Sequence, residues 1–183
     1  MFRFMQDQDC SSYAELYEWS IRHREDFWQA LIQFCEVRFS KPADAVLTQD
    51  GDMTTAKWYS GGELNFAQHL LRNSGDRAAM IFYGENRKRR ELSFDALRDK
   101  VAQAAAGMRR AGVTRGDRVG AFLPNCPEAI IAMLATSSMG AVWSSCSPDF
   151  GINGVVDRLG QIEPKVLVCA DGYFYAGKQF DSL

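Results

Sequence analysis

The sequence has few of the residues that build metal sites and disulfide frameworks. It contains only two histidines, His23 and His69, which lie far apart and have no ligand-spaced companions, so we expect no metal site built on them. Its five cysteines include no CxxC pair, and this odd, unpatterned number is typical of reduced thiols in a cytosolic protein. These absences predict a cytoplasmic protein without a metal centre.

Long apolar runs and a strong charge of either sign are also missing. No apolar run approaches the roughly 20 residues of a membrane-spanning helix, and the N-terminus lacks the apolar core and cleavage site of a secretory signal. The net charge of −2 gives no reason to expect nucleic acid or a membrane surface as an obligatory partner. The 183 residues, 46% of them hydrophobic, suit a globular domain.

Three short apolar runs, separated by two segments with helical periodicity, lie at residues 119–123, 141–143 and 166–170. Runs of this length are typical of strands covered on both faces. Strand, helix, strand, helix and strand in that order predict a partial parallel sheet with flanking helices, and therefore the α/β class. Because ligands of such sheets bind outside the carboxyl ends of the strands, the loops at residues 124–125, 144–149 and 171–178 are the candidate binding segments.

Residues 1–60 are predicted to form a helical N-terminal segment and a linker. A capping-box pattern begins at Ser12. The aromatic and aliphatic residues behind it indicate one or two helices over residues 13–37, broken near residues 23–24 and packed against a core. Residues 41–55 are polar and without period, which predicts a loop.

Residues 61–183 are predicted to form an incomplete αβ subdomain. A hairpin is expected over residues 78–94, with the basic residues 87–90 in its solvated turn. Asn125 and Glu128 are expected to form the capping pair of the helix after the first parallel strand.

The predicted three-stranded unit would keep an open edge, which natural sheets normally cover. The sequence stops about a dozen residues after the last predicted strand. We therefore expect the chain to be a fragment of a larger fold or to need a partner.

Two nucleotide-binding patterns can be compared with the sequence. Residues 172–179 follow a predicted strand and nearly match GxxxxGK[ST], the pattern of a phosphate-binding loop. Gln179, however, offers no hydroxyl for Mg²⁺. Three aromatic residues also occupy the loop, where small residues are favoured. The dinucleotide pattern GxGxxG is missing from every predicted strand-to-helix turn. A P-loop nucleotide hydrolase is therefore kept only as a third interpretation.

Four nucleophile-type residues crowd the end of the second predicted strand: Ser144, Ser145, Cys146 and Ser147. A nucleophile needs a positioned base, and neither histidine is near in sequence. Hydroxyl groups that satisfy the backbone at a strand end are the better interpretation.

Several segments, taken in order, carry a resemblance to one family. They are Leu16-Tyr-Glu-Trp-Ser20, Trp58-Tyr-Ser-Gly-Gly-Glu-Leu-Asn65, Pro124-Asn-Cys-Pro-Glu128, Trp143-Ser-Ser-Cys-Ser-Pro-Asp-Phe-Gly151 and Ala170-Asp-Gly-Tyr-Phe-Tyr-Ala-Gly-Lys178. Together they make the sequence resemble the acetoacetyl-CoA synthetase family of adenylate-forming acyl-CoA synthetases. The resemblance runs through most of this chain but covers only the first quarter to third of such an enzyme.

The resemblance implies a two-step ligase. ATP, with Mg²⁺, and a carboxylate would form an acyl-adenylate and pyrophosphate, and the CoA thiol would then displace AMP. The family's Ser/Thr/Gly-rich phosphate loop, its adenine and ribose motifs and its adenylation lysine are absent from these 183 residues. No catalytic residue is assigned, and we expect this chain alone not to catalyse adenylation.

The CoA side of the site is the part that the resemblance places in this chain. In related enzymes the loop matching residues 171–178 carries basic residues near the 3′-phosphate of CoA, and the matching positions here are Tyr175 and Lys178. Ser147 and Asp149 match the neighbouring loop beside the CoA tunnel. Tyr175 departs from the family pattern because it carries no cation.

An alternative from another class stays open at this point. The chain would then be a non-catalytic α/β module that binds CoA, or a protein partner at its exposed sheet edge. In either case the expected partners are CoA and the remainder of the synthetase or another subunit.

Overall fold

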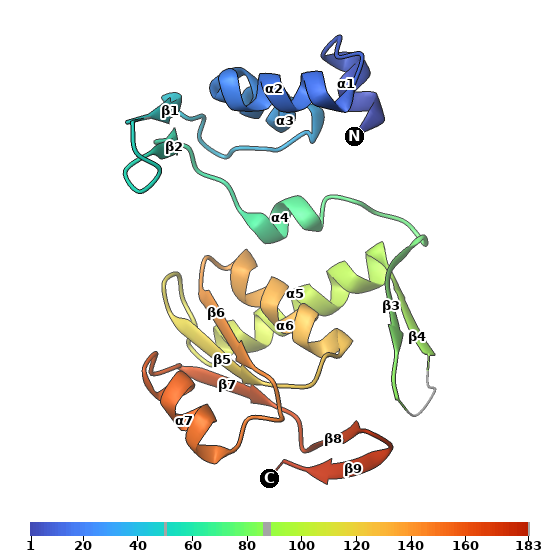
Figure 1. The fold of residues 1–183 in the computed structure, drawn as a ribbon. Coiled ribbons are helices and arrows are strands. Elements are labelled where there is room, and N and C mark those ends of the chain that lie inside the picture. Colours follow the sequence, from blue (N-terminus) through green and yellow to red (C-terminus); the bar gives the residue numbers. More distant parts are fainter. Residues whose placement is uncertain (50, 86–88, 183) are drawn as a thin grey trace. The chain divides into compact units, whose positions relative to one another are not determined.

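The structure is a computed structural model that describes residues 1–49, 51–85 and 89–182 (Figure 1). The chain divides into two compact units, Met1–Leu64 and Asn65–Leu183. Of the basic run at residues 87–90, only Arg89 and Arg90 belong to the described residues.

Three helices open the N-terminal unit: α1 (Phe2–Asp7), α2 (Tyr13–Arg22) and α3 (Arg24–Phe34). The predicted break near residues 23–24 is confirmed, since His23 separates α2 from α3. The Ser12 hydroxyl accepts a hydrogen bond from the Glu15 amide at 3.2 Å, which confirms the predicted cap. The Glu15 carboxylate reaches back to the Ser11 amide at 2.8 Å, one residue further than a capping box requires.

Aromatic side chains hold these helices together. The Phe27 ring lies 5.9 Å from that of Phe4 and 5.6 Å from those of Trp19 and Trp28, all in edge-to-face geometry. Phe4 and Leu16 are buried, but α3 has no buried residue. The aromatic residues therefore pack mainly on one another, and Trp28 and Phe34 stay exposed.

A two-stranded antiparallel sheet completes the N-terminal unit. It pairs β1 (Ala45–Thr48) with β2 (Lys57–Ser60), with Leu47 opposite Trp58. The prediction of a loop over residues 41–55 was therefore wrong for β1. A four-residue strand carries too short a pattern to be recognised, and only its pairing with β2 defines it.

The C-terminal unit contains four further helices and seven strands among its described residues. They are α4 (Phe66–Leu70), β3 (Ala78–Tyr83), β4 (Arg89–Ser93), α5 (Phe94–Arg110), β5 (Arg118–Phe122), α6 (Pro127–Ser138), β6 (Val142–Cys146), α7 (Ile152–Gly160), β7 (Val166–Cys169), β8 (Gly172–Tyr175) and β9 (Lys178–Asp181).

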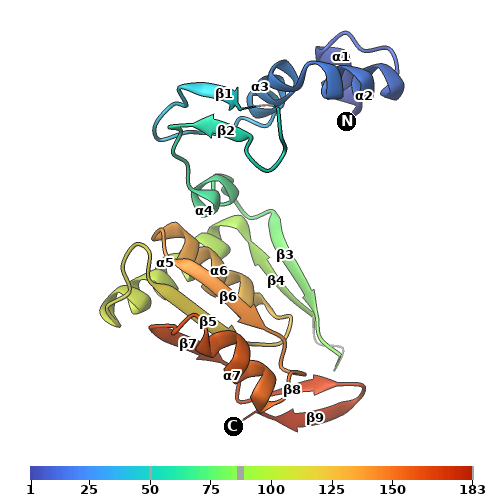
Figure 2. The same cartoon turned by 60° about the vertical axis from the view of Figure 1, so that its left-hand side comes forward.

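The three predicted apolar runs form one parallel sheet with the order β6-β5-β7. Val119 of β5 lies in register with Trp143 of β6 and Val166 of β7. Right-handed connections to opposite sides of β5 place α6 and α7 on opposite faces of the sheet, as Figure 2 shows. The predicted α/β class is confirmed, and the predicted hairpin is confirmed as the antiparallel pair β3–β4. The placement of the basic residues in its turn was wrong for Arg89 and Arg90, which belong to β4 and pair with Tyr83 and Phe82.

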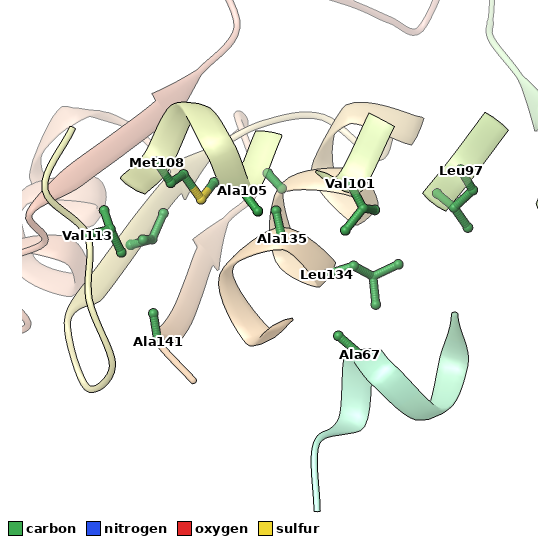
Figure 3. Close-up of a cluster of buried hydrophobic side chains, with 11 residues drawn as sticks. Ala67, Leu97, Val101, Ala105, Met108, Val113, Leu134, Ala135 and Ala141 are labelled. Atoms are coloured by element: carbon green, nitrogen blue, oxygen red, sulfur yellow. The ribbon is translucent and has the colours of Figure 1, made fainter. Parts of the chain in front are cut away.

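The main core lies between this sheet and the helices α5 and α6. Val101 and Ala105 of α5 and Leu134 and Ala135 of α6 are buried there, together with Val119 of β5. Figure 3 shows the facing side chains of the two helices, with Ala67 of α4 closing one end. Small residues on both helices allow the backbones to approach closely.

The face of the sheet that points away from α5 and α6 is less completely covered than expected. Val142 of β6 and Leu167 of β7 are about half exposed, 52% and 51%, although both lie on parallel strands. Gly120 at the centre of this face is closely approached by Pro164, 3.1 Å from the position that a Cβ atom would take. The prediction of strands covered on both faces therefore holds for β5 but not for the outer strands, because α7 is the one helix that the described residues place on this side.

Candidate functional site

A cavity of about 690 Å³ opens at the carboxyl end of the parallel sheet. Its walls come from residues 124–126 after β5, residues 147–149 after β6, residues 172–175 of β8, and residues 82–85 with Arg90 of the β3–β4 hairpin. Ligands of parallel sheets bind at this edge. The cavity brings together the three segments that the strand order selected.

The β5–α6 connection forms one wall because α6 begins abruptly. Pro127 occupies the first helical turn, where its missing N–H has no intrahelical role. The N-cap residue is consequently Cys126, without a side-chain cap hydrogen bond. The predicted cap at Asn125 was wrong, because this residue lies one position before the N-cap. Asn125 lines the cavity instead.

Glu128, the other half of the predicted capping pair, bonds to the hairpin. Arg90 donates to both of its carboxylate oxygens, Nη1 to Oε1 at 2.8 Å and Nη2 to Oε2 at 2.7 Å. These hydrogen bonds lower the pKa of Glu128 from 4.5 to about 2. Arg90 also lies over the ring of Phe82, its cross-strand neighbour, at 5.2 Å. The hairpin wall of the cavity is thus attached to the first turn of α6.

The residues after β7 form a hairpin, which was not predicted. Gly172 is required there, since a Cβ atom would lie 2.6 Å from the Phe180 carbonyl oxygen. The rings of Tyr173 and Phe180 stack at 5.3 Å, and the Tyr173 hydroxyl donates to the Pro148 carbonyl at 3.2 Å. These contacts hold the β8–β9 hairpin against the β6–α7 loop.

The P-loop interpretation of residues 172–179 was wrong. The segment runs as β8, a turn at Ala176 and Gly177 with φ of 51° and 73°, and β9. A phosphate-binding loop would instead lead into a helix N-terminus. The Gly177 amide donates to the Glu85 carboxylate at 3.2 Å, so the turn contacts the β3–β4 hairpin.

Three of the four predicted site residues line the cavity. Ser147 and Asp149 contribute from the β6–α7 loop and Tyr175 from β8. Lys178 pairs with Tyr175 across the hairpin but is not among the lining residues. All four side chains are exposed and therefore accessible to a ligand.

The cavity also contains a thiol, from Cys126. Burial raises the pKa of this thiol, so it is protonated at neutral pH and is a poor nucleophile. Cys146, in the cluster of nucleophile-type residues, is buried. Neither cysteine has the properties of an activated nucleophile.

Arg90, Phe82 and Tyr173 line the cavity but were not among the predicted site residues. The signal for Arg90 and Phe82 was present in the hairpin pattern, since opposite residues of an antiparallel pair share a face. Which residues lie opposite each other depends on the register of the hairpin, however. The register could not be predicted because the length of the turn was uncertain. Tyr173 could not be recognised because β8 and β9 were not predicted.

Metal sites and membrane-spanning helices can be assessed for residues 1–49, 51–85 and 89–182. Within these ranges, no three His, Cys, Asp or Glu residues cluster in a way that would hold a metal ion. No helix there is both long and apolar enough to cross a membrane.

Two family models match the chain. The model described as "AMP-binding enzyme" matches residues 66–182, and the one described as "Acetyl-coenzyme A synthetase N-terminus" matches residues 13–70.

Individual proteins show the same similarity. An acetoacetyl-coenzyme A synthetase of Rhizobium meliloti (strain 1021) is 45% identical over 172 residues, which are 93% of this chain and 26% of the relative. An acetoacetyl-CoA synthetase of Mus musculus is 43% identical over 94% of this chain and 26% of its own length. The solved structure of acetoacetyl-CoA synthetase from Streptomyces lividans, 44% identical, matches with a TM-score of 0.87 over 93% of this chain and 27% of that one. The chain thus spans about a quarter of the length of the relatives it matches.

Proposed function

Because this chain belongs to the family of AMP-binding enzymes, we propose that it forms the N-terminal part of an acetoacetyl-CoA synthetase-like ligase. Such an enzyme would activate a carboxylate with ATP and transfer the acyl group from its adenylate to the thiol of CoA. The similarity to acetoacetyl-CoA synthetases along 93% of the chain supports this proposal. Residues 61–183 would be an incomplete αβ subdomain of the adenylate-forming domain, and residues 1–60 the segment that precedes it.

The adenylation step would depend on residues outside this sequence. The 183 residues contain no Ser/Thr/Gly-rich phosphate loop ending in lysine. The described residues also offer no cluster of acidic ligands for Mg²⁺. The residues present therefore do not fit MgATP, and no step of the adenylation reaction is assigned to them.

The contribution of this chain would be to the CoA side. The observation that carries this part is the cavity at the carboxyl ends of the strands, lined by Ser147, Asp149 and Tyr175. A hydroxyl, a carboxylate and a phenol provide hydrogen-bonding groups for an extended polar ligand. Lys178, exposed on the same hairpin, would approach an anionic group outside the cavity.

The partner for the sheet would be the remainder of the synthetase. In the described part of the chain, β6 and β7 pair only with β5, which leaves the outer edge of each strand open. Open edges in natural proteins are normally covered. Val142 and Leu167 are half exposed on one face of these strands, which supports a further segment that covers this face. Such an enzyme would act in the cytoplasm, where the free thiols of Cys10, Cys126, Cys146 and Cys169 would stay reduced.

The experiment that tests this function is a chimera with the Streptomyces lividans acetoacetyl-CoA synthetase. This chain would replace the matching 27% of that enzyme, and acetoacetyl-CoA formation would be measured. We expect activity from the chimera and no ATP–pyrophosphate exchange from the chain alone. A folded chimera that is inactive, beside an active parent enzyme, would argue against the proposal.

A further inference from the structure

The cavity has an asymmetric distribution of charge. Among its described lining residues, Arg90 is the only cation, whereas Glu85 and Asp149 are acidic. The Glu85 carboxylate already accepts a hydrogen bond from the Gly177 amide. An anionic ligand in the cavity would therefore find one favourable charged partner on its walls.

Arg90 is held in a defined orientation. Its two terminal nitrogens donate to the two oxygens of Glu128 at 2.8 and 2.7 Å, and its guanidinium lies over the Phe82 ring. Because both terminal nitrogens are hydrogen-bonded to the same carboxylate, the plane of the guanidinium group is fixed. Arg90 consequently loses little conformational entropy when a ligand binds.

Arg90 also keeps donors for a ligand. A guanidinium group carries five N–H donors, and the two hydrogen bonds to Glu128 use two of them, which leaves three. The side chain is 47% exposed, so the unused donors are accessible. Because Glu128 compensates the charge of Arg90, recognition would depend on directed hydrogen bonds more than on net charge.

We propose that Arg90 is the anion-binding residue of this cavity, that it receives a phosphate or diphosphate group through the donors not used by Glu128, and that Glu128 is a positioning residue. The identity of the ligand as CoA rests on the proposed function. The assignment of Arg90 itself rests on the lining of the cavity and on the geometry of the ion pair.

The test is isothermal titration calorimetry of the whole chain with CoA, dephospho-CoA and pantetheine. Losing hydrogen bonds from a charged donor predicts that Arg90→Met raises the Kd for CoA about tenfold to a hundredfold. Arg90→Lys keeps the charge without the fork and should fall between wild type and Arg90→Met. Glu128→Gln should weaken CoA binding less than Arg90→Met does. Pantetheine, which has no phosphate, should bind wild type and all variants equally.

The three ligands separate the two phosphate sources of CoA. If the effect of Arg90→Met disappears with dephospho-CoA, the 3′-phosphate is the bound group; if it persists, the diphosphate is. Arg77→Met is the matched control, because Arg77 also lies over an aromatic ring, that of Phe94 at 5.2 Å, and neither residue lines the cavity. It should leave the Kd for CoA unchanged.

Unchanged CoA binding by Arg90→Met would overturn the inference while leaving the proposed function intact. If wild type binds neither CoA nor pantetheine, the CoA-side function fails. The role of Arg90 is then tested with inorganic pyrophosphate, whose ³¹P line broadens when it binds the protein. Broadening by wild type but not by Arg90→Met would support Arg90 as a phosphate receptor, and equal line widths would overturn it. Circular dichroism melts verify folding; should Arg90→Met not fold, Arg90→Lys makes the same comparison.

Discussion

Glu128 shows how one residue can have a different role from the one that its local sequence indicates. Its position in the first turn of α6 favours an anion, which agrees with a capping role. Its hydrogen-bond partner, however, is Arg90, 38 residues earlier in the chain. The pattern around residue 125 could not reveal this pair, since it exists only when the hairpin is placed beside α6.

The ion pair predicts a pH dependence of stability. The pKa of Glu128 in the folded chain is about 2, below the 4.5 of an unperturbed glutamate. The stabilisation from ionised Glu128 is therefore complete above pH 4.5 and is lost as the pH falls from 4.5 towards 2. Both side chains are about half exposed, so the contribution is small, up to roughly 1 kcal/mol. Urea denaturation at pH 6 and pH 3 should show a smaller loss of stability for Glu128→Gln than for wild type.

Asp117→Asn provides the comparison for this prediction. Lys165 and Thr114 lower the pKa of Asp117 to about 2 at the other end of β5. Its effect should fall in the same pH range and add to that of Glu128→Gln, because the two sites share no partner. Parallel pH profiles of wild type and Glu128→Gln would contradict the role given to the pair.

At the scale of elements, the helices and strands with strong patterns were predictable, and those defined by a partner were not. The parallel strands, the helix break at His23 and the β3–β4 hairpin follow from periodicity and turn residues. The β1 strand has four residues, and β8 and β9 lie in a segment, residues 172–179, that nearly matches a phosphate-loop pattern. Such short strands are stabilised by their pairing and not by local preference.

The packing of α5 against α6 should dominate the stability of the C-terminal unit. Leu134 is 2% exposed and lies in the core between these helices. Leu134→Ala should lower the free energy of unfolding by about 2–5 kcal/mol, because it removes buried methyl groups and leaves a cavity. The matched control is Ile152→Ala on α7, where the side chain is 84% exposed and the change should stay within about 0.5 kcal/mol. Equal effects, measured by urea denaturation, would refute this assignment of the core.

The β8–β9 hairpin should depend on Gly172. An alanine Cβ would lie 2.6 Å from the Phe180 oxygen, and this neighbour is backbone, so the strands must separate. Gly172→Ala should therefore reduce the hydrogen-exchange protection of the amides at residues 173–180. Gly107→Ala is the control, because its Cβ would meet only the end of the Arg110 side chain at 3.9 Å, and it should stabilise α5 by about 0.5–1 kcal/mol. Retained protection in Gly172→Ala would show that the hairpin is not set by this contact.

At the scale of the whole molecule, strand order located the candidate site better than any single residue did. The carboxyl ends of the parallel strands selected three loops, and the structure gathers all three around one cavity. Individual side chains were less predictable: Lys178 lies outside the lining, and Arg90 inside it. Topology depends on the order of patterns along the chain, whereas side-chain contacts depend on register and on turns that the sequence leaves undefined.

The most direct test of the central claim, that this cavity is the CoA-side site of the chain, is an NMR titration of the ¹⁵N-labelled chain with CoA. We predict chemical-shift changes of the amides of Ser147, Asp149, residues 172–175 and Arg90, which surround the cavity. Residues 112–116, before the amino end of β5, should not respond. Shifts confined to the amino ends of the strands, or no shifts at saturating CoA, would contradict the account.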